Sequence, residues 1–65
     1  MSNNEPSRRL EPLLTIEDLA DYLQVPVKTI YDWRSKEIGP TAYKFGRHLR
    51  YRACDVEAWI ADQVA

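Results

Sequence analysis

The stretch that decides the fold runs from Leu13 to Lys36 and reads LLTIEDLADYLQVPVKTIYDWRSK. Thr15 is a typical helix N-cap, and Asp18, three residues later, can complete a capping box with it. The apolar residues that follow recur at the i, i+3, i+4 and i+7 spacing of one helix face, at Ile16, Leu19, Ala20 and Leu23. This pattern predicts a short first helix over residues 16–23.

A break and a second helix follow within the same stretch. Residues 24–26 (QVP) interrupt the pattern, because proline donates no backbone hydrogen bond and disfavours helical backbone in the residue before it. The helical spacing resumes with Ile30 and Trp33 on one side, and Gly39–Pro40 ends the segment. We therefore expect a second helix over about residues 27–36, after a turn of about three residues.

Residues 43–52 (YKFGRHLRYR) change from helical spacing to alternation on both sides of a glycine. This predicts a two-stranded hairpin with Arg47 and His48 at its tip. The side chains expected to face the core are Tyr43, Phe45, Leu49 and Tyr51, and those expected to face outward are Lys44, Arg50 and Arg52.

A third helix is predicted from about Asp55, and Asp55 and Glu57 near its start suit the helix dipole. Its expected inward residues are Val56, Trp59, Ile60 and Val64. We also expect four large aromatic side chains in the core, namely Trp33, Trp59, Tyr43 and Tyr51. The whole order predicts one mainly α domain with a small β-hairpin.

Residues 1–12 hold two prolines and, apart from the initiator methionine, only Leu10 as a large apolar residue. We expect a flexible N-terminal arm there, followed by a folded domain over residues 13–65. Arg8 and Arg9 of the arm can reach a DNA minor groove or a phosphate, or they can be incidental charges of a disordered tail.

The charge of the 65-residue chain is −1 overall but is segregated along the sequence. Residues 25–52 carry seven Lys and Arg against two Asp and Glu, whereas residues 1–24 and 53–65 are both acidic. This basic island favours a polyanionic partner. A solvated charged face and an acidic protein partner are the alternatives.

Several classes of protein are disfavoured by what the sequence lacks. It has one His, one Cys and no glycine-rich phosphate loop, so we expect no enzyme, no catalytic residue, no cofactor and no metal site. No apolar run approaches the roughly 20 residues of a membrane span, and the start lacks the apolar stretch of a signal peptide. We expect a soluble, cytoplasmic protein with no membrane partner.

Four segments, in this order and at these spacings, resemble the excisionase-type branch of the MerR-like winged helix-turn-helix family. They are residues 13–25, Thr29–Arg34, Phe45–Tyr51 and Asp55–Ile60, within a match that covers about residues 13–62. The resemblance implies a winged helix-turn-helix, with a helix-turn-helix, a two-stranded wing and a C-terminal helix.

The sequence departs from the family pattern at three positions. Gln24 stands where glycine is usual in the turn, and a positive φ there would cost on the order of 1 kcal/mol. Pro26 stands where a small hydroxyl N-cap is usual, and Cys54 replaces the serine often found before the third helix. We therefore expect weaker caps at both helix starts, with Cys54 in a structural role.

The resemblance also implies which residues touch DNA. The second helix would enter the major groove and present Lys28, Thr29, Tyr31 and Arg34. The wing would contact a narrow minor groove or the backbone through Lys44, Arg47, His48 and Arg50. Two alternatives stay open. Asp32 can accept a hydrogen bond from a cytosine amine or orient Arg34, or it can have a structural role beside Lys28 or Lys36. Arg50 and Arg52 can pair with the acidic first or third helix instead of binding DNA.

As a stand-alone domain of this family, the chain resembles phage or integrative-element excisionases, also called recombination directionality factors. The resemblance implies a partner set of double-stranded DNA, an integrase and neighbouring copies on bent DNA in a bacterial host cell, with no small-molecule effector. The alternative function is a small AlpA-like transcriptional regulator built on the same domain. A protein-interaction module, which would show no preference for any duplex, is the third hypothesis.

Overall fold

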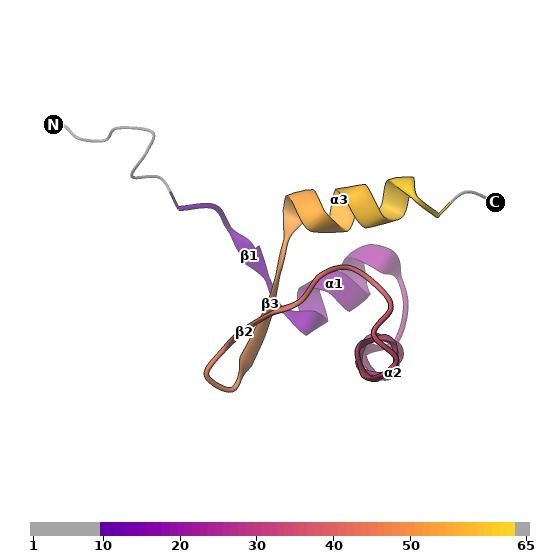
Figure 1. The fold of residues 1–65 in the computed structure, drawn as a ribbon, viewed down its shortest axis with the longest axis horizontal. Helices are drawn as coiled ribbons and strands as arrows, with labels where there is room; N and C mark the ends of the chain where they lie inside the picture. The colour runs from indigo at the N-terminus through magenta and orange to yellow at the C-terminus, as the bar shows by residue number, and fades with distance from the viewer. Residues whose placement is uncertain (1–9, 64–65) are drawn as a thin grey trace, which may run out of the picture.

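The structure is a computed structural model that describes residues 10–63, so Arg8, Arg9 and Val64 lie outside the described residues. The elements are β1 (Leu13–Leu14), α1 (Ile16–Leu23), α2 (Val27–Ser35), β2 (Tyr43–Phe45), β3 (His48–Arg52) and α3 (Ala53–Ala61) (Figure 1). Three helices and a small antiparallel sheet confirm the predicted fold class of a mainly α winged helix-turn-helix.

α1 has the predicted bounds, and its start is fixed by a capping box. The Thr15 hydroxyl accepts a hydrogen bond from the Asp18 N–H at 2.9 Å, and the Asp18 carboxylate accepts one from the Thr15 N–H at 3.0 Å. These bonds satisfy two backbone donors that the first turn would otherwise leave unpaired. The inner face of α1 buries Ile16, Leu19 and Ala20.

The turn after α1 passes through Gln24, whose φ of 61° lies in the left-handed region. The Val25 N–H reaches the Ala20 carbonyl at 3.0 Å and the Gln24 N–H reaches that of Asp21 at 3.2 Å, which is the bonding pattern of a Schellman motif. The Gln24 amide nitrogen also donates to the Asp21 carbonyl at 2.7 Å. The expected strain at Gln24 is thus present, and its own side chain helps to offset it.

α2 begins after Pro26, which supplies no side-chain cap, and it ends one residue earlier than predicted. A second Schellman pattern closes it, since the Ile38 N–H bonds the Trp33 carbonyl at 2.9 Å. Glu37 takes the left-handed position with φ of 59°. Gly39 then packs on the Trp33 ring, where a Cβ would lie 3.2 Å from a ring carbon, so this close approach requires glycine.

The sheet has the strand order β1-β3-β2, with antiparallel pairs throughout. β1 was not predicted, because a two-residue strand is too short to show alternation. Leu13 pairs with Arg52 and Leu14 with Tyr51, which ties the chain before α1 to the strand before α3. The wing strands are therefore part of a three-stranded sheet.

The register of the wing corrects one prediction. A two-residue turn pairs Phe45 with His48 and Tyr43 with Arg50, and directly paired residues project from the same face of a sheet. Tyr43 and Phe45 thus lie on the face opposite Leu49 and Tyr51, and the expectation that all four face the core was wrong. Accordingly, Phe45 is 53% exposed, while Tyr51 is buried.

The core lies between α1, α2, β3 and α3. It is made of Ile16, Leu19, Ala20, Ile30, Tyr51 and Val56. Trp33 and Trp59 contact each other at its edge, with ring centroids 5.2 Å apart at a tilt of 44°. Tyr43 and Trp59 are only half-buried and are absent from this cluster, so their expected place in the core was wrong.

α3 starts two residues earlier than predicted, and its N-cap is Arg52, which makes no side-chain cap. Cys54 consequently lies exposed within the first turn instead of preceding the helix. The reason is the direct connection from β3, which leaves no loop in which a separate cap residue could stand.

Candidate nucleic-acid interface

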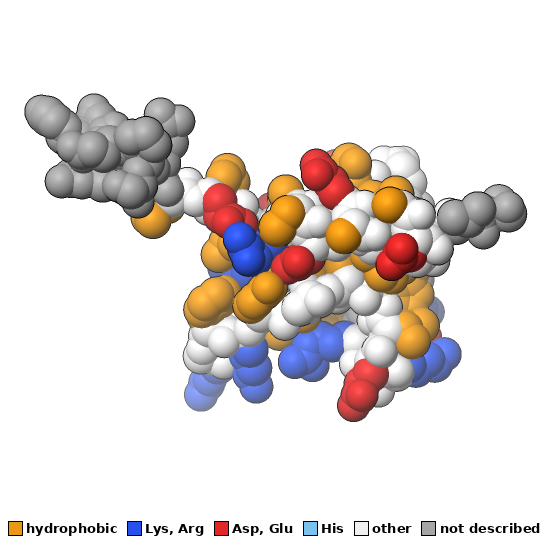
Figure 2. All heavy atoms as spheres, turned by 45° about the horizontal axis from the view of Figure 1, so that its top comes forward, with side chains coloured by type: hydrophobic (Ala, Val, Ile, Leu, Met, Phe, Trp, Pro, Cys, Tyr) orange, Lys and Arg blue, Asp and Glu red, His pale blue; other side chains and the backbone are white. Residues whose placement is uncertain are grey.

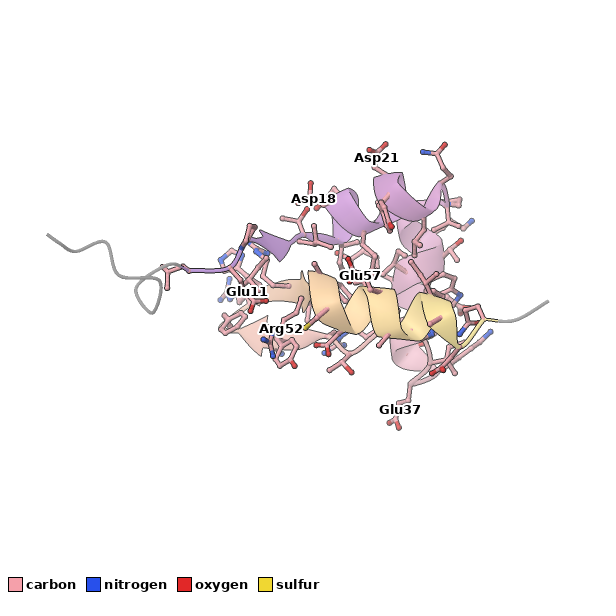
Figure 3. All side chains as sticks on the ribbon, turned by 90° about the horizontal axis from the view of Figure 1, so that it is seen from above. Glu11, Asp18, Asp21, Glu37, Arg52 and Glu57 are labelled. Carbon is pink, nitrogen blue, oxygen red and sulfur yellow. The ribbon has the colours of Figure 1, made fainter. Side chains whose placement is uncertain are left out.

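Charge is divided between two faces of the molecule. Lys and Arg side chains gather along the lower edge in Figure 2, where the wing and α2 lie, and most acidic side chains are above them. Asp18 and Asp21 on α1 and Glu57 on α3 belong to the acidic part, as Figure 3 shows. Glu37 is separate, since it projects outward beyond the C-terminal end of α2.

The first groove on the basic side has a volume of about 270 Å³ and lies where α1, α2 and the wing meet. Its lining residues are Ile16, Glu17, Tyr31, Arg47, His48, Leu49 and Arg50. It brings together four predicted contact residues, one from α2 and three from the wing. Two guanidinium groups, an imidazole and a phenol are suitable donors for the phosphates of a nucleic acid.

Glu17 is a lining residue that the sequence analysis did not single out. It is exposed in the first turn of α1 and is the acidic member of this groove. A local pattern could not have revealed it, because Glu17 and Arg47 are thirty positions apart and meet only through the tertiary fold. Its carboxylate would repel a nearby polyanion, but the groove keeps a net positive charge because Arg47 and Arg50 outnumber it.

A second groove, of about 420 Å³, borders the C-terminal half of α2. It is lined by Arg34, Trp33, Glu37 and Tyr51 among others, so Arg34 lines this groove and not the first one. Burial raises the pKa of the Tyr51 phenol, and the positive charge of Arg34 acts in the opposite direction. The exposed Arg34 guanidinium therefore lies close enough to the inner end of the groove to influence Tyr51.

The remaining predicted contact residues line neither groove. Lys28 is exposed and Thr29 is half-buried in the first turn of α2, where the Thr29 N–H bonds the Pro26 carbonyl at 3.0 Å. Lys44 is exposed on β2, but it shares the sheet face of Leu49, so the expectation that it lies on the opposite face was wrong. These three residues flank the grooves from α2 and from the wing.

Ion pairs decide two of the alternatives left by the sequence. Asp32 pairs with Lys36 at 3.0 Å along the exposed side of α2, which is its structural option. Arg52 pairs with Glu11, and neither acidic helix supplies its partner. Within residues 10–63, Arg50 has no carboxylate partner, and its guanidinium donates to the Leu49 carbonyl at 2.7 Å.

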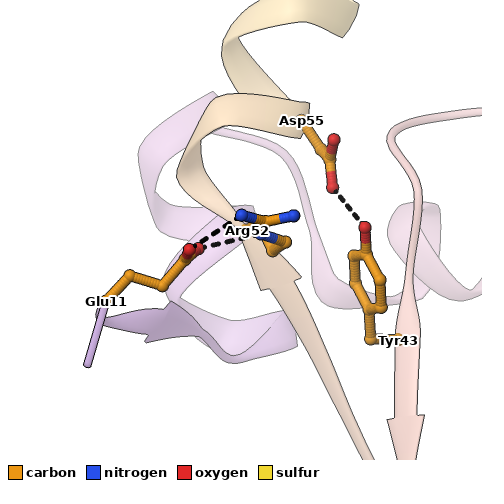
Figure 4. Close-up of polar contacts among 4 residues, drawn as sticks. All are labelled: Glu11, Tyr43, Arg52 and Asp55. Atoms are coloured by element: carbon orange, nitrogen blue, oxygen red, sulfur yellow. Dashed lines mark hydrogen bonds and ion pairs between the residues drawn. The ribbon is translucent and has the colours of Figure 1, made fainter. Parts of the chain in front are cut away.

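The Glu11–Arg52 contact is bidentate, with N···O distances of 3.0 and 2.9 Å (Figure 4). The hydrogen bonds from Arg52 lower the pKa of Glu11, and those same bonds raise the pKa of Arg52. Nearby, the Tyr43 hydroxyl donates to the Asp55 carboxylate at 2.9 Å. Together these bonds hold the residues before β1, the base of the wing and the start of α3 at one place, away from both grooves.

The described part of the chain lacks two further classes of site. None of its helices combines the length and the apolar character needed to cross a membrane. Residues 10–63 likewise contain no cluster of three His, Cys, Asp or Glu side chains that could hold a metal ion.

Comparison with known proteins gives one match. Residues 13–64 fit the family model of a helix-turn-helix domain, which covers all six elements of the fold. No curated protein and no solved structure matches the chain.

Proposed function

We propose that this chain, which belongs to the family of helix-turn-helix domains and therefore binds double-stranded DNA, recognises specific sequences with α2 and the wing together. The observation that carries this proposal is the first groove, in which Tyr31 of α2 lies with Arg47, His48 and Arg50 of the wing. A DNA backbone seated there would be gripped from both elements at once.

The two elements take different parts in this binding. α2 enters the major groove, which is about 12 Å wide, and reads base edges or holds phosphates with Lys28, Thr29, Tyr31 and Arg34. The wing lies over the adjacent backbone, with Arg47 directed into a narrow minor groove and His48 beside it. Lys44 and Arg50 hold phosphates from the wing strands.

Within this class, the function that fits best is that of an excisionase. The chain would bind adjacent sites, bend the DNA and direct an integrase toward excision. Binding to DNA would stabilise the folded domain, whose buried core within residues 10–63 contains six residues, because DNA binds the folded state and not the unfolded chain. The family resemblance of residues 13–62 supports the same role.

The test is a gel-shift titration against duplexes tiled across the gene neighbourhood, at moderate salt and with competitor DNA. A ladder of several selective shifts at an attachment site is the expected result. A single selective shift at a promoter would replace the excisionase by a small transcriptional regulator. Absence of any selective shift would contradict sequence-specific binding altogether.

The wing is tested separately with Arg47→Ala. Loss of one phosphate or minor-groove contact should reduce the slope of log affinity against log salt by roughly one. Arg52→Ala is the matched control, because it removes the same charge from a residue already paired with Glu11 outside the grooves. An unchanged slope for Arg47→Ala would remove the wing from the interface.

A further inference from the structure

The acidic side of the molecule contains an apolar notch between α1 and α3. It has a volume of about 210 Å³ and is lined by Leu14, Tyr22, Ala53, Val56 and Glu57. Val56 is buried and forms part of the apolar lining, whereas Tyr22 is 62% exposed at the notch. Such a feature is available to a ligand even while the opposite, basic side is occupied by DNA.

The charges around the notch restrict what it can take. Glu57 lines it from α3, and Asp18 lies one helical turn from Tyr22 on α1. Figure 3 looks onto this side and shows Glu57 between the two helices, with Asp18 and Asp21 projecting from α1. The notch therefore fits an apolar side chain that is accompanied by cations.

The chain itself contains a segment of this chemistry. Leu10 is 90% exposed, the highest value among the large apolar residues of the described range, and it directly follows Arg8 and Arg9 in the sequence. We propose that the notch of one copy binds residues 8–10 of a second copy, with Leu10 against the apolar lining and the two arginines beside the acidic rim.

The geometry before α1 favours a second copy over the same chain. Leu14 lines the notch, and the extended residues between it and Leu10 span roughly 13 Å at the rise of a strand. Figure 1 shows this segment leading away from α1 and α3. The bidentate pair of Glu11 with Arg52 holds the residue next to Leu10 beside β3, which favours this direction of the segment.

The contact joins two different surfaces, so each bound copy still offers one free arm and one free notch. Such a heterologous contact extends head to tail instead of closing into a symmetric dimer. The association does not require DNA. Only the role of this contact between copies on adjacent DNA sites rests on the proposed function. There, DNA would raise the effective concentration of one copy beside the next.

The experiment measures self-association of the full chain without DNA, by sedimentation and by NMR spectra over a dilution series. Concentration should shift the amide signals of Tyr22, Ala53, Val56 and Glu57 together. Leu10→Ser should weaken association roughly tenfold to hundredfold, the effect of exposing one leucine side chain. Phe45→Ser is the matched control, since it removes an exposed apolar side chain on the wing and should leave association unchanged.

Glu57→Lys should weaken association as well, and a mixture of the Leu10→Ser and Glu57→Lys chains should associate again. The first variant keeps an intact notch and the second an intact arm, so one native contact per pair is restored. Both variants should bind a single DNA site as the unchanged chain does, which separates this inference from the proposed function.

Three results would overturn the inference. The first is a chain that stays monomeric, with notch signals that do not move on dilution. The second is a set of shifts that Leu10→Ser abolishes but concentration does not affect, because the arm would then occupy the notch of its own chain. The third is a mixture of variants that fails to associate while the unchanged chain does.

Discussion

The two helices of the helix-turn-helix are nearly equal in length but are held in different ways. α1 starts with a complete capping box and buries three residues, whereas α2 starts at a proline without a side-chain cap and buries only Ile30. α1 thus has both a local cap and the larger buried face, while α2 has neither. The difference indicates that α1 serves as the scaffold and that α2 leaves its outward side chains free for a ligand.

The ends of these helices extend the comparison. Both close in a Schellman pattern with a non-glycine residue in the left-handed region, Gln24 after α1 and Glu37 after α2. Gln24 gains a side-chain hydrogen bond to the preceding turn. Within residues 10–63, Glu37 makes no side-chain hydrogen bond or ion pair, so its strain is uncompensated.

The largest effect is expected from Leu19→Ala in the scaffold helix. Leu19 is fully buried, and its truncation should lower the free energy of unfolding by about 2–5 kcal/mol. That approaches the whole stability of a small domain. Urea unfolding followed by circular dichroism measures it, with the exposed Tyr31→Ala on α2 as control, and an equal loss in both variants would break the comparison.

Arg34→Ala on α2 should change the other property. It should reduce DNA affinity and leave the free energy of unfolding unaltered. Its loss should cost about 1–3 kcal/mol on a specific site and relax the preference at one base position. Affinities for a panel of single-base variants of the site measure this. An equal loss on every duplex would assign Arg34 to phosphate alone.

Glu37→Gly tests the uncompensated strain at the end of α2. Glycine adopts the left-handed conformation freely, so the variant should gain about 1 kcal/mol in unfolding free energy. Ser35→Gly, two residues earlier and inside the helix, is the matched control and should lose stability. A destabilised Glu37→Gly chain would mean that the Glu37 side chain has a stabilising role of its own.

Glu17 is the place where the scaffold helix enters the basic groove. Glu17→Gln should strengthen binding to all duplexes by up to about 1 kcal/mol, because it removes an exposed anion near the DNA. Asp21→Asn makes the same change of charge on α1 away from that groove. Fluorescence anisotropy compares them, and equal gains would indicate net charge instead of position.

The smallest effect concerns pH and the Glu11–Arg52 pair beside β1. Since folding lowers the pKa of Glu11 below its ordinary value of 4.5, the pair contributes stability above that pH and loses it as the pH falls through the lowered pKa. The melting temperature of Glu11→Gln should therefore be below that of the unchanged chain at neutral pH and converge with it in acid. A constant difference across this range would contradict the assignment.

The sequence predicted those elements whose signals are local. α1 follows from Thr15, Asp18 and the apolar spacing, and the wing follows from alternation around Gly46. The side-chain faces of the wing were mispredicted. Alternation shows which residues of one strand share a face, but the number of residues in the turn decides which face of the other strand matches it.

The candidate site was predicted to a similar extent. Arg47, His48 and Tyr31 lie together in one groove, although their roles on DNA remain predictions. Glu17, the Glu11–Arg52 pair and the notch could not be predicted, since each joins segments that only the tertiary fold brings together. The strain at Glu37 was also hidden, because a glutamate after a helix is not a recognised signal for left-handed backbone.

The two-residue turn between Phe45 and His48 limits how the wing can change during evolution. Inserting or deleting a single residue there would turn the side chains of one strand to the opposite face of the sheet, so that core-facing and solvent-facing positions would be exchanged. A change of two residues would keep each side chain on its present face. Natural variation in the length of this wing is therefore expected in even steps.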